Sequence, residues 1–161
     1  MYNGYTFLDL DGVILDSEER IVELKKTNQK LEWNQFFETV DWIKILRESN
    51  SINNSVEIIK ELEKTQKKIV ILTKIHTLLE MEAKVLELRD NRKINIPILF
   101  VPPHVKKSQI YIPLNKEILI DDSLKNVDDW DLNGGDGILF DPYDRVAAKR
   151  KIKSLEFLLK R

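Results

Sequence analysis

Short apolar runs alternate with stretches of helical periodicity along most of the chain. The runs fall at about 5–10, 69–73, 96–101, 117–121 and 137–140, and the helical patterns at about 18–30, 34–48, 53–66, 76–90, 123–131 and 144–160. Strands that alternate with helices predict an α/β fold with a central, doubly wound parallel sheet of about five strands. Pro97 suits this arrangement, because it lies at the start of its run, where a strand tolerates a proline.

The connection between the first two predicted strands is longer than a crossover requires. It runs from Gly12 to about Lys68, whereas a crossover needs about a dozen residues or a little more. The helical pattern at 53–66 can supply the crossover, so residues 17–49 are surplus and predict an inserted pair of helices. We therefore expect a core formed by residues 1–16 and 50–161 and a small helical insertion at 17–49.

Pairs of aspartates follow two of the predicted strands. Asp9 and Asp11 come directly after the first apolar run, just before Gly12, and Asp121 and Asp122 follow the run that ends at Ile120. Carboxylates that meet in a small volume repel one another, and a bound cation is the usual remedy. Open α/β sheets bind their ligands at the carboxyl ends of the strands. The sequence therefore predicts a divalent-metal site at this edge of the sheet.

Two further polar positions lie between these acidic pairs. Thr73 ends the second predicted strand, and Lys106 and Lys107 precede the fourth. The order Asp-x-Asp, Thr, Lys, Asp-Asp resembles the four sequence motifs of the haloacid dehalogenase (HAD) superfamily of phosphohydrolases. The resemblance implies a HAD-like Rossmannoid core, with residues 17–49 as a cap over the active site. A cap of this kind excludes water and selects the substrate.

The resemblance also implies roles for the first acidic pair. Asp9 matches the nucleophile, which forms a phospho-aspartate and divides one difficult step into two easier ones. Asp11 matches the general acid/base, whose presence favours phosphate-ester hydrolysis over dehalogenation. The implied cofactor is Mg²⁺, bound by Asp9, Asp122 and the backbone carbonyl of Asp11. Asp121 is expected to bind the ion through water or to position Asp122.

Thr73 and a lysine complete the implied site. The Thr73 hydroxyl and the N–H groups after it match the positions that hold the phosphoryl oxygens. Lys107 matches the cation that pairs with Asp9, and Lys106 is its competitor. Taken singly, each motif residue is also compatible with an ordinary turn, strand or surface role, and four residues have open interpretations. Asn126 is either a helper of the metal site or a surface residue, His76 is substrate-contacting or structural, His104 has no visible partner, and Asp16 is expected to cap the following helix.

Composition narrows the possible environments and partners. The chain carries 26 Lys and Arg against 27 Asp and Glu, which gives no electrostatic argument for binding nucleic acid or a membrane surface. It has no cysteine, which excludes disulfides, thiolate catalysis and cysteine-ligated zinc. No run approaches a membrane span, and no signal peptide is visible. We therefore expect a cytoplasmic protein whose partner is a small phosphomonoester; the sequence does not give its oligomeric state.

The predicted cap contains several aromatic residues. A helical pattern places Phe36, Val40 and Ile43 on one face, which is typical of a core, while rings near a phosphatase site could stack on a base. The small cap, Lys107-Ser108 and the strand ending Ile-Asp-Asp resemble the cytosolic-type 5′(3′)-deoxyribonucleotidases. That resemblance implies a substrate among the nucleoside monophosphates. The alternatives are a phosphatase of another small metabolite, a polynucleotide 3′-phosphatase and a catalytically silent binding protein.

Overall fold

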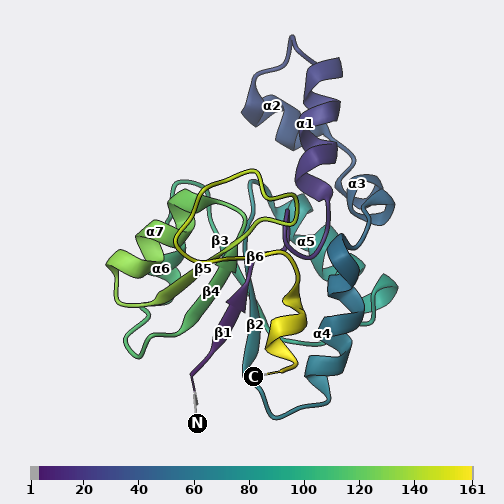
Figure 1. Ribbon diagram of the computed structural model, residues 1–161. Coiled ribbons are helices and arrows are strands. Elements are labelled where there is room, and N and C mark those ends of the chain that lie inside the picture. Colours follow the sequence, from purple (N-terminus) through teal and green to yellow (C-terminus); the bar gives the residue numbers. More distant parts are fainter. Residues whose placement is uncertain (1–3, 161) are drawn as a thin grey trace.

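The computed structural model describes residues 4–160 and shows a six-stranded parallel sheet with helices on both faces (Figure 1). The strand order is β3-β2-β1-β4-β5-β6. Every neighbouring pair of strands is parallel. The strands are β1 (Thr6–Leu8), β2 (Ile69–Lys74), β3 (Ile98–Val101), β4 (Ile118–Asp121), β5 (Asp136–Phe140) and β6 (Lys151–Ile152). The α/β class and the parallel sheet are as predicted.

The helices connect the strands and supply the layers on either side of the sheet. The α-helices are α1 (Ser17–Thr27), α2 (Trp33–Thr39), α3 (Trp42–Glu48), α4 (Ser55–Glu63), α5 (Leu78–Leu86), α6 (Lys107–Ile110) and α7 (Leu124–Leu132). Two 3₁₀ turns, η1 (Ile52–Asn54) and η3 (Leu155–Leu158), and one π-helical turn, η2 (Glu87–Asn91), complete the set. In the part of the chain that the structure describes, no helix is both long enough and apolar enough to cross a membrane.

Alternating strand residues fill two cores, one on each face of the sheet. Successive side chains of a strand point to opposite faces, so Leu8 joins the larger core and Phe7 the smaller one. The larger core includes Ile59 of α4 and Leu155 of η3, and the smaller one includes Trp130 of α7. The central strands are therefore buried on both faces, which fixes their register and the position of their carboxyl ends.

The strand order reverses between β1 and β4. From β1 the chain moves outward through β2 and β3, and it returns to the other side of β1 with β4. A crevice forms at such a switch point, outside the carboxyl ends of the two strands. The Asp9 N–H donates to the Ile120 carbonyl at 2.9 Å, which extends the β1–β4 pairing by one residue. Asp9 and Asp121 are thus carried to the same crevice.

Helices α1, α2 and α3 lie between β1 and α4 and rise above the carboxyl edge of the sheet (Figure 1). The two chain segments that lead into and out of them run side by side. The Asp16 carboxylate accepts hydrogen bonds from the Asn50 N–H at 2.7 Å and from Asn50 Nδ2 at 3.0 Å. The prediction that the Asp16 side chain caps α1 is wrong, because no hydrogen bond to the helix N-terminus forms. Its partner Asn50 is distant in sequence, and only the folded chain brings it close.

One predicted helix is divided into two in the structure. The pattern at 34–48 predicted one helix, but Val40 is extended and the Asp41 carboxylate accepts from the Lys44 N–H at 3.0 Å. An aspartate that can cap a new helix favours a break at this point, so α2 and α3 are separate. Helix α2 also begins at Trp33, one residue earlier than predicted.

The predicted helix at 144–160 is wrong. Residues Lys151–Ile152 form β6 beside β5, and Leu155 and Leu158 are buried in the larger core. The Asp141 carboxylate accepts hydrogen bonds from the N–H groups of Arg145 at 3.0 Å and Val146 at 2.8 Å, which holds the preceding loop. Pairing with the sheet edge outweighs the helical periodicity of this segment.

Candidate active site

Three carboxylates converge at the crevice between β1 and β4. Asp9, Asp121 and Asp122 each offer one oxygen within 4.8 Å of the others. Asp9 follows β1, Asp121 ends β4, and Asp122 is the first residue after β4. Gly12 makes room for this cluster, since a Cβ on it would lie 2.0 Å from Asp122 Oδ2. The aspartates after β1 and β4 therefore meet, as the strand-end argument predicted.

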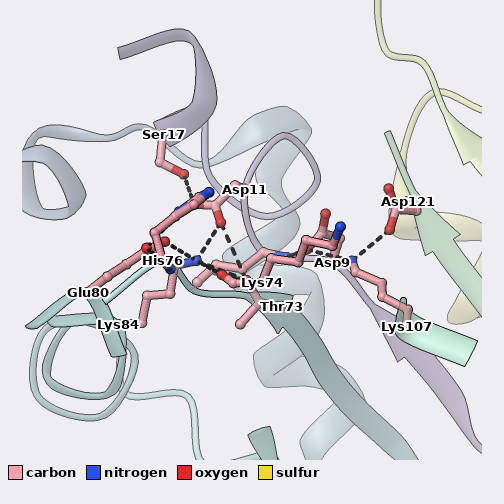
Figure 2. Close-up of polar contacts among 11 residues, drawn as sticks. Asp9, Asp11, Ser17, Thr73, Lys74, His76, Glu80, Lys84, Lys107 and Asp121 are labelled. Atoms are coloured by element: carbon pink, nitrogen blue, oxygen red, sulfur yellow. Dashed lines mark hydrogen bonds and ion pairs between the residues drawn. The ribbon is translucent and has the colours of Figure 1, made fainter. Parts of the chain in front are cut away.

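A buried lysine joins two of these carboxylates. Lys107 Nζ lies 2.9 Å from Asp9 Oδ1 and 2.6 Å from Asp121 Oδ2 (Figure 2). Lys107 opens α6, a one-turn helix that the sequence did not predict, and the lysine is only 3% exposed. Lys106 points elsewhere, and its Nζ lies 2.5 Å from Asp129 Oδ1 on α7. Of the two candidate lysines, Lys107 is the one that contacts Asp9.

Asp121 and Asp122 have different surroundings. Asp121 is fully buried and accepts hydrogen bonds from Lys107, from the Ser123 N–H at 2.9 Å and from Asn126 Nδ2 at 3.1 Å. Asp122 is partly exposed and lines the cleft above the sheet. Asp121 is thus held by protein donors, whereas Asp122 faces the space in which a ligand would bind. Asn126 contacts Asp121 and is not a free surface residue.

Asp11 lies in a second network, which draws on β2, α1 and α5. Its Oδ1 accepts a hydrogen bond from the Ser17 hydroxyl at 2.6 Å, and its Oδ2 lies 2.6 Å from Lys84 Nζ (Figure 2). Thr73 is buried beside them, with its hydroxyl oxygen 3.4 Å from Asp11 Oδ2 and 3.0 Å from Lys84 Nζ. The structure therefore brings Asp11 and Thr73 together, on the side of Asp9 that faces α5.

Sequence reasoning missed Lys84 and its partner Glu80. Both are buried in α5, with Lys84 Nζ 2.8 Å from Glu80 Oε1. In a sequence, a glutamate four residues before a lysine in a helical pattern is typical of a solvated helix surface. Only their burial against Asp11 distinguishes this pair, and no pattern in the chain signals that burial.

The electrostatics of the acidic cluster favour a cation. Burial, together with the charges of Asp121 and Asp11, raises the pKa of Asp9 to about 7, although Lys107 opposes the shift. Burial, with the charges of Asp9, Glu18 and Asp121, raises the pKa of Asp122 to about 9. One lysine therefore does not balance the three carboxylates. A divalent cation with oxygen ligands would reverse these shifts, and carboxylate oxygens are the donors that Mg²⁺ prefers.

The pKa of Asp11 shifts in the opposite direction from those of Asp9 and Asp122. Burial by itself would raise the pKa of Asp11, but the charge and hydrogen bond of Lys84 and the Ser17 hydroxyl hold that pKa below its usual value. Burial opposes the charged form of Lys84 as well, yet Asp11 and Glu80 raise the pKa of its ammonium. Asp11 and Lys84 therefore form an ion pair beside a cluster that is short of positive charge.

The crevice opens into a cleft of about 1110 Å³. Asp9, Asp11 and Asp122 lie at its base, and the insertion contributes an apolar wall made of Ile21, Val22, Trp33 and Phe37. The Phe37 ring stacks on His76 with a centroid separation of 3.7 Å. His76 Nδ1 lies 2.9 Å from Glu80 Oε2, and His76 also lines the cleft.

The remaining sequence candidates lie around this cleft. His104 is among the residues that line it. Phe36 is buried, whereas Ile43, which the helical pattern placed on the same face, is 47% exposed. The break between α2 and α3 separates these two residues, so the predicted single face does not form.

Comparison with solved structures identifies the fold. The chain superposes on the HAD-hydrolase YfnB from Bacillus subtilis, bound to magnesium, with a TM-score of 0.67 at 15% identity, covering 99% of this chain and 98% of that one. A haloacid dehalogenase-like hydrolase from Streptococcus pneumoniae gives a TM-score of 0.60 at 14% identity over 86% and 84% of the two chains. An apo phosphoserine phosphatase gives 0.57 at 15% identity over 99% and 98%. The chain has the HAD-like fold.

The sequence comparisons add nothing to this assignment. No protein-family model matches the chain, and no curated protein matches it in sequence. The likeness is therefore one of architecture at low identity, and the chemistry has to be argued from the site itself.

Proposed function

We propose that this protein is a Mg²⁺-dependent phosphomonoesterase that works through a phospho-aspartate on Asp9. The observation that carries the proposal is the meeting of Asp9, Asp121 and Asp122 with Lys107 at the base of a cleft. Three carboxylates in one crevice attract a cation, and a lysine beside one of them can offset the charge of a phosphoryl group. The likeness to a magnesium-bound HAD-hydrolase and to a phosphoserine phosphatase supports this reading.

In the proposed reaction, an Asp9 carboxylate oxygen attacks phosphorus as the bond to the leaving oxygen breaks. Asp11 in its protonated form gives its proton to the leaving oxygen. The resulting carboxylate then takes a proton from the water that attacks the phospho-aspartate, which returns Asp9 and releases inorganic phosphate. The ion pair with Lys84 favours the carboxylate form of Asp11. This form serves the second step, whereas the first step requires Asp11 to take up a proton against that preference.

The metal would be held by Asp9 and Asp122, with the backbone carbonyl of Asp11 and with Asp121 as supporting groups. When bound, Mg²⁺ supplies positive charge to the phosphoryl oxygens and offsets the repulsion among the carboxylates. Lys107 favours the ionised form of Asp9 and orients it, because its ammonium lies 2.9 Å from the attacking carboxylate.

For the substrate we propose a nucleoside monophosphate. Residues 17–49 would act as the cap, since they supply the apolar wall of the cleft. Trp33 is 47% exposed and packs against Phe37 with ring centroids 5.3 Å apart. Exposed rings above a phosphoryl site can stack on a base, with a contribution of about 1–3 kcal/mol per base. A phosphatase of another small metabolite is the second candidate, favoured by the likeness to phosphoserine phosphatase.

Phosphate release over a substrate panel tests the proposal. The panel contains nucleoside and deoxynucleoside monophosphates, sugar phosphates, phosphoserine and a 3′-phosphorylated oligonucleotide, each with Mg²⁺ and with EDTA. We expect release from monophosphates that requires Mg²⁺ and is abolished in Asp9→Asn, with the circular dichroism spectrum unchanged. Release from the oligonucleotide end alone would instead indicate a polynucleotide phosphatase. No release from any substrate would indicate a binding protein and overturn the proposal.

The nucleotide preference has its own control. Trp33→Ala should raise KM for nucleotides by about 5- to 100-fold, because one stacking contact is lost, and should leave KM for phosphoserine unchanged. Ile43→Ala is the matched control, since Ile43 is equally exposed on α3 but lies outside the residues that line the cleft. Equal effects of Trp33→Ala on both substrates would remove the stacking argument.

A further inference from the structure

Lys84 is an unusual lysine for its position. It lies on α5 and is fully buried, with its head group beside the end of β2 and the turn after β1. Its ammonium lies near four oxygens: Asp11 Oδ2 at 2.6 Å, Lys74 O at 2.6 Å, Glu80 Oε1 at 2.8 Å and Thr73 Oγ1 at 3.0 Å. An ammonium has three protons to donate, so the Lys84 head group has no free donor for a ligand.

Lys84 also does not reach the cleft. Asp9, Asp11 and Lys107 line that cleft, and Lys84 does not. The Asp11 carboxylate is held on both sides, because Ser17 donates to Oδ1 while Lys84 contacts Oδ2. Lys84 is therefore placed to act on the position of its neighbours and not on a substrate.

We propose that Lys84 is a positioning residue that fixes the Asp11 carboxylate and the Thr73 hydroxyl in one arrangement. This inference rests on the proposed function, in which Asp11 transfers protons. A proton-transfer group must stay within hydrogen-bond reach of its target, and a misplacement of about 1 Å can cost on the order of 10²-fold in rate. A single buried ammonium that contacts both groups sets the distance between them.

The Lys84 side chain is itself held in place by Glu80. Glu80 accepts hydrogen bonds from the His76 N–H at 2.7 Å and contacts His76 Nδ1 at 2.9 Å, while its other oxygen faces Lys84. The Lys84 side chain therefore has a defined position before any substrate arrives. Such a prearranged support is what holds a reacting group in its productive geometry.

Kinetics of Lys84→Met test the inference. With p-nitrophenyl phosphate, whose leaving group departs without protonation, we expect kcat to fall on the order of 10²-fold with KM within about threefold. We also expect a burst of up to one nitrophenolate per enzyme, because the water-activation step becomes slow. Wild-type kcat without a burst would overturn the inference. So would a lower kcat without a burst, which is what a smaller fraction of folded molecules would give.

The double variant identifies the residue through which Lys84 acts. In an Asp11→Asn background, Lys84→Met should change kcat less than about threefold, because coupled residues are not additive. The same fold-loss in both backgrounds would overturn the inference. Arg92→Met is the control: it removes another cation from a buried partner, Glu87, at 2.6 Å. It should lower the melting temperature without altering kcat or producing a burst.

Two further measurements apply if Lys84→Met does not fold or if the protein shows no turnover. If Lys84→Met does not fold, the pair Lys84→Met/Glu80→Gln, which leaves one fewer unpaired carboxylate, should give the same burst. A crystal structure of the variant needs no turnover, and we expect Asp11 or Thr73 to occupy a new side-chain conformation there. Unchanged conformations of both would overturn the inference. An inactive wild-type protein would defeat the proposed function, while this crystallographic comparison would still decide the role of Lys84.

Discussion

At the scale of single residues, the site depends on which carboxylates have a protein cation as partner. Lys107 forms ion pairs with Asp9 and Asp121, and Lys84 forms one with Asp11. Among residues 4–160, Asp122 forms no ion pair with a lysine. The carboxylate without a lysine is also the one whose pKa is raised to about 9. The sequence pattern indicated both acidic pairs, Thr73 and the two lysines at 106 and 107 as site candidates. It did not indicate Lys84, because a buried ammonium has no sequence pattern of its own.

Substitution of Lys107 should affect activity far more than substitution of Lys106. Lys107→Met removes the cation beside Asp9, so we expect turnover to fall by about 10²- to 10³-fold. It also leaves two buried carboxylates without an ion-pair partner, which should destabilise the metal-free protein by about 3–5 kcal/mol. Lys106→Met removes an ion pair on an exposed lysine, so activity should stay within about twofold and stability within about 1 kcal/mol. Phosphate release and urea unfolding measure the two effects, and equal losses would contradict the assignment.

The two adjacent aspartates should respond in opposite directions. Asp122→Asn removes a repelling charge from the cluster, so the metal-free protein should become more stable while the Mg²⁺ concentration for half-maximal activity rises. Asp121→Asn disturbs contacts with Lys107, Ser123 and Asn126, so it should destabilise the protein with or without Mg²⁺. Thermal unfolding and Mg²⁺ titration of both variants provide the comparison. A larger Mg²⁺ effect in Asp121→Asn would reverse the proposed ligand choice.

At the scale of elements, the ends of strands and the turns after them decide where the chemistry lies. The apolar runs at 5–10 and 117–121 predicted β1 and β4, and their carboxyl ends carry the acidic pairs. The turn after β1 depends on Gly12, whose φ of +82° lies in the left-handed region. Glycine reaches this region without strain, whereas a residue with a Cβ does not.

Gly12→Ala should therefore damage the site through the turn. The added Cβ would lie 2.0 Å from Asp122 Oδ2, so that Asp122 must move away from Asp9. We expect a loss of about 1–2 kcal/mol from the backbone conformation, together with weaker Mg²⁺ dependence and lower turnover. Gly134→Ala is a useful control, because Gly134 also has a positive φ but a Cβ on it would lie 3.1 Å from the Pro113 carbonyl oxygen and away from the acidic cluster. A loss of stability alone in Gly12→Ala would show that the close approach to Asp122 is unimportant.

At the scale of the whole molecule, the topology assembles the site, and α1 and α2 supply a wall of the cleft above it. The reversal of strand order puts β1 beside β4, although more than a hundred residues separate Asp9 from Asp121. The Asp16–Asn50 pair joins the two chain segments that lead into α1 and out of α3, and α1 and α2 contribute the apolar wall of the cleft. The folded chain thus concentrates negative charge at one edge, and the pH dependence of its stability should reveal this.

The metal-free protein should lose stability as the pH rises from about 4 toward 9. Asp9 and Asp122 have folded-state pKa values of about 7 and about 9, above the value of about 4 expected for an unfolded aspartate. Between these limits the folded state binds more protons than the unfolded state, so the free energy of unfolding falls with increasing pH. Saturating Mg²⁺ should remove most of this slope, because the cation favours the ionised carboxylates. Melting temperatures from pH 5 to 9, with EDTA and with Mg²⁺, give the measurement, and a rising metal-free curve would contradict it.

The sequence by itself determined the α/β class, the five longer strands and the positions of Asp9, Asp11, Thr73, Asp121 and Asp122 at or just after strand ends. These follow from local patterns, since burial on both faces requires apolar runs and strand ends expose the polar residues that come next. The tertiary structure alone decided which of Lys106 and Lys107 contacts Asp9, the pairing of Asp11 with Lys84, the strand β6 in place of a helix and the rings that face the cleft. Each of these depends on contacts between segments far apart in the chain, where burial and charge outweigh the preferences of short segments.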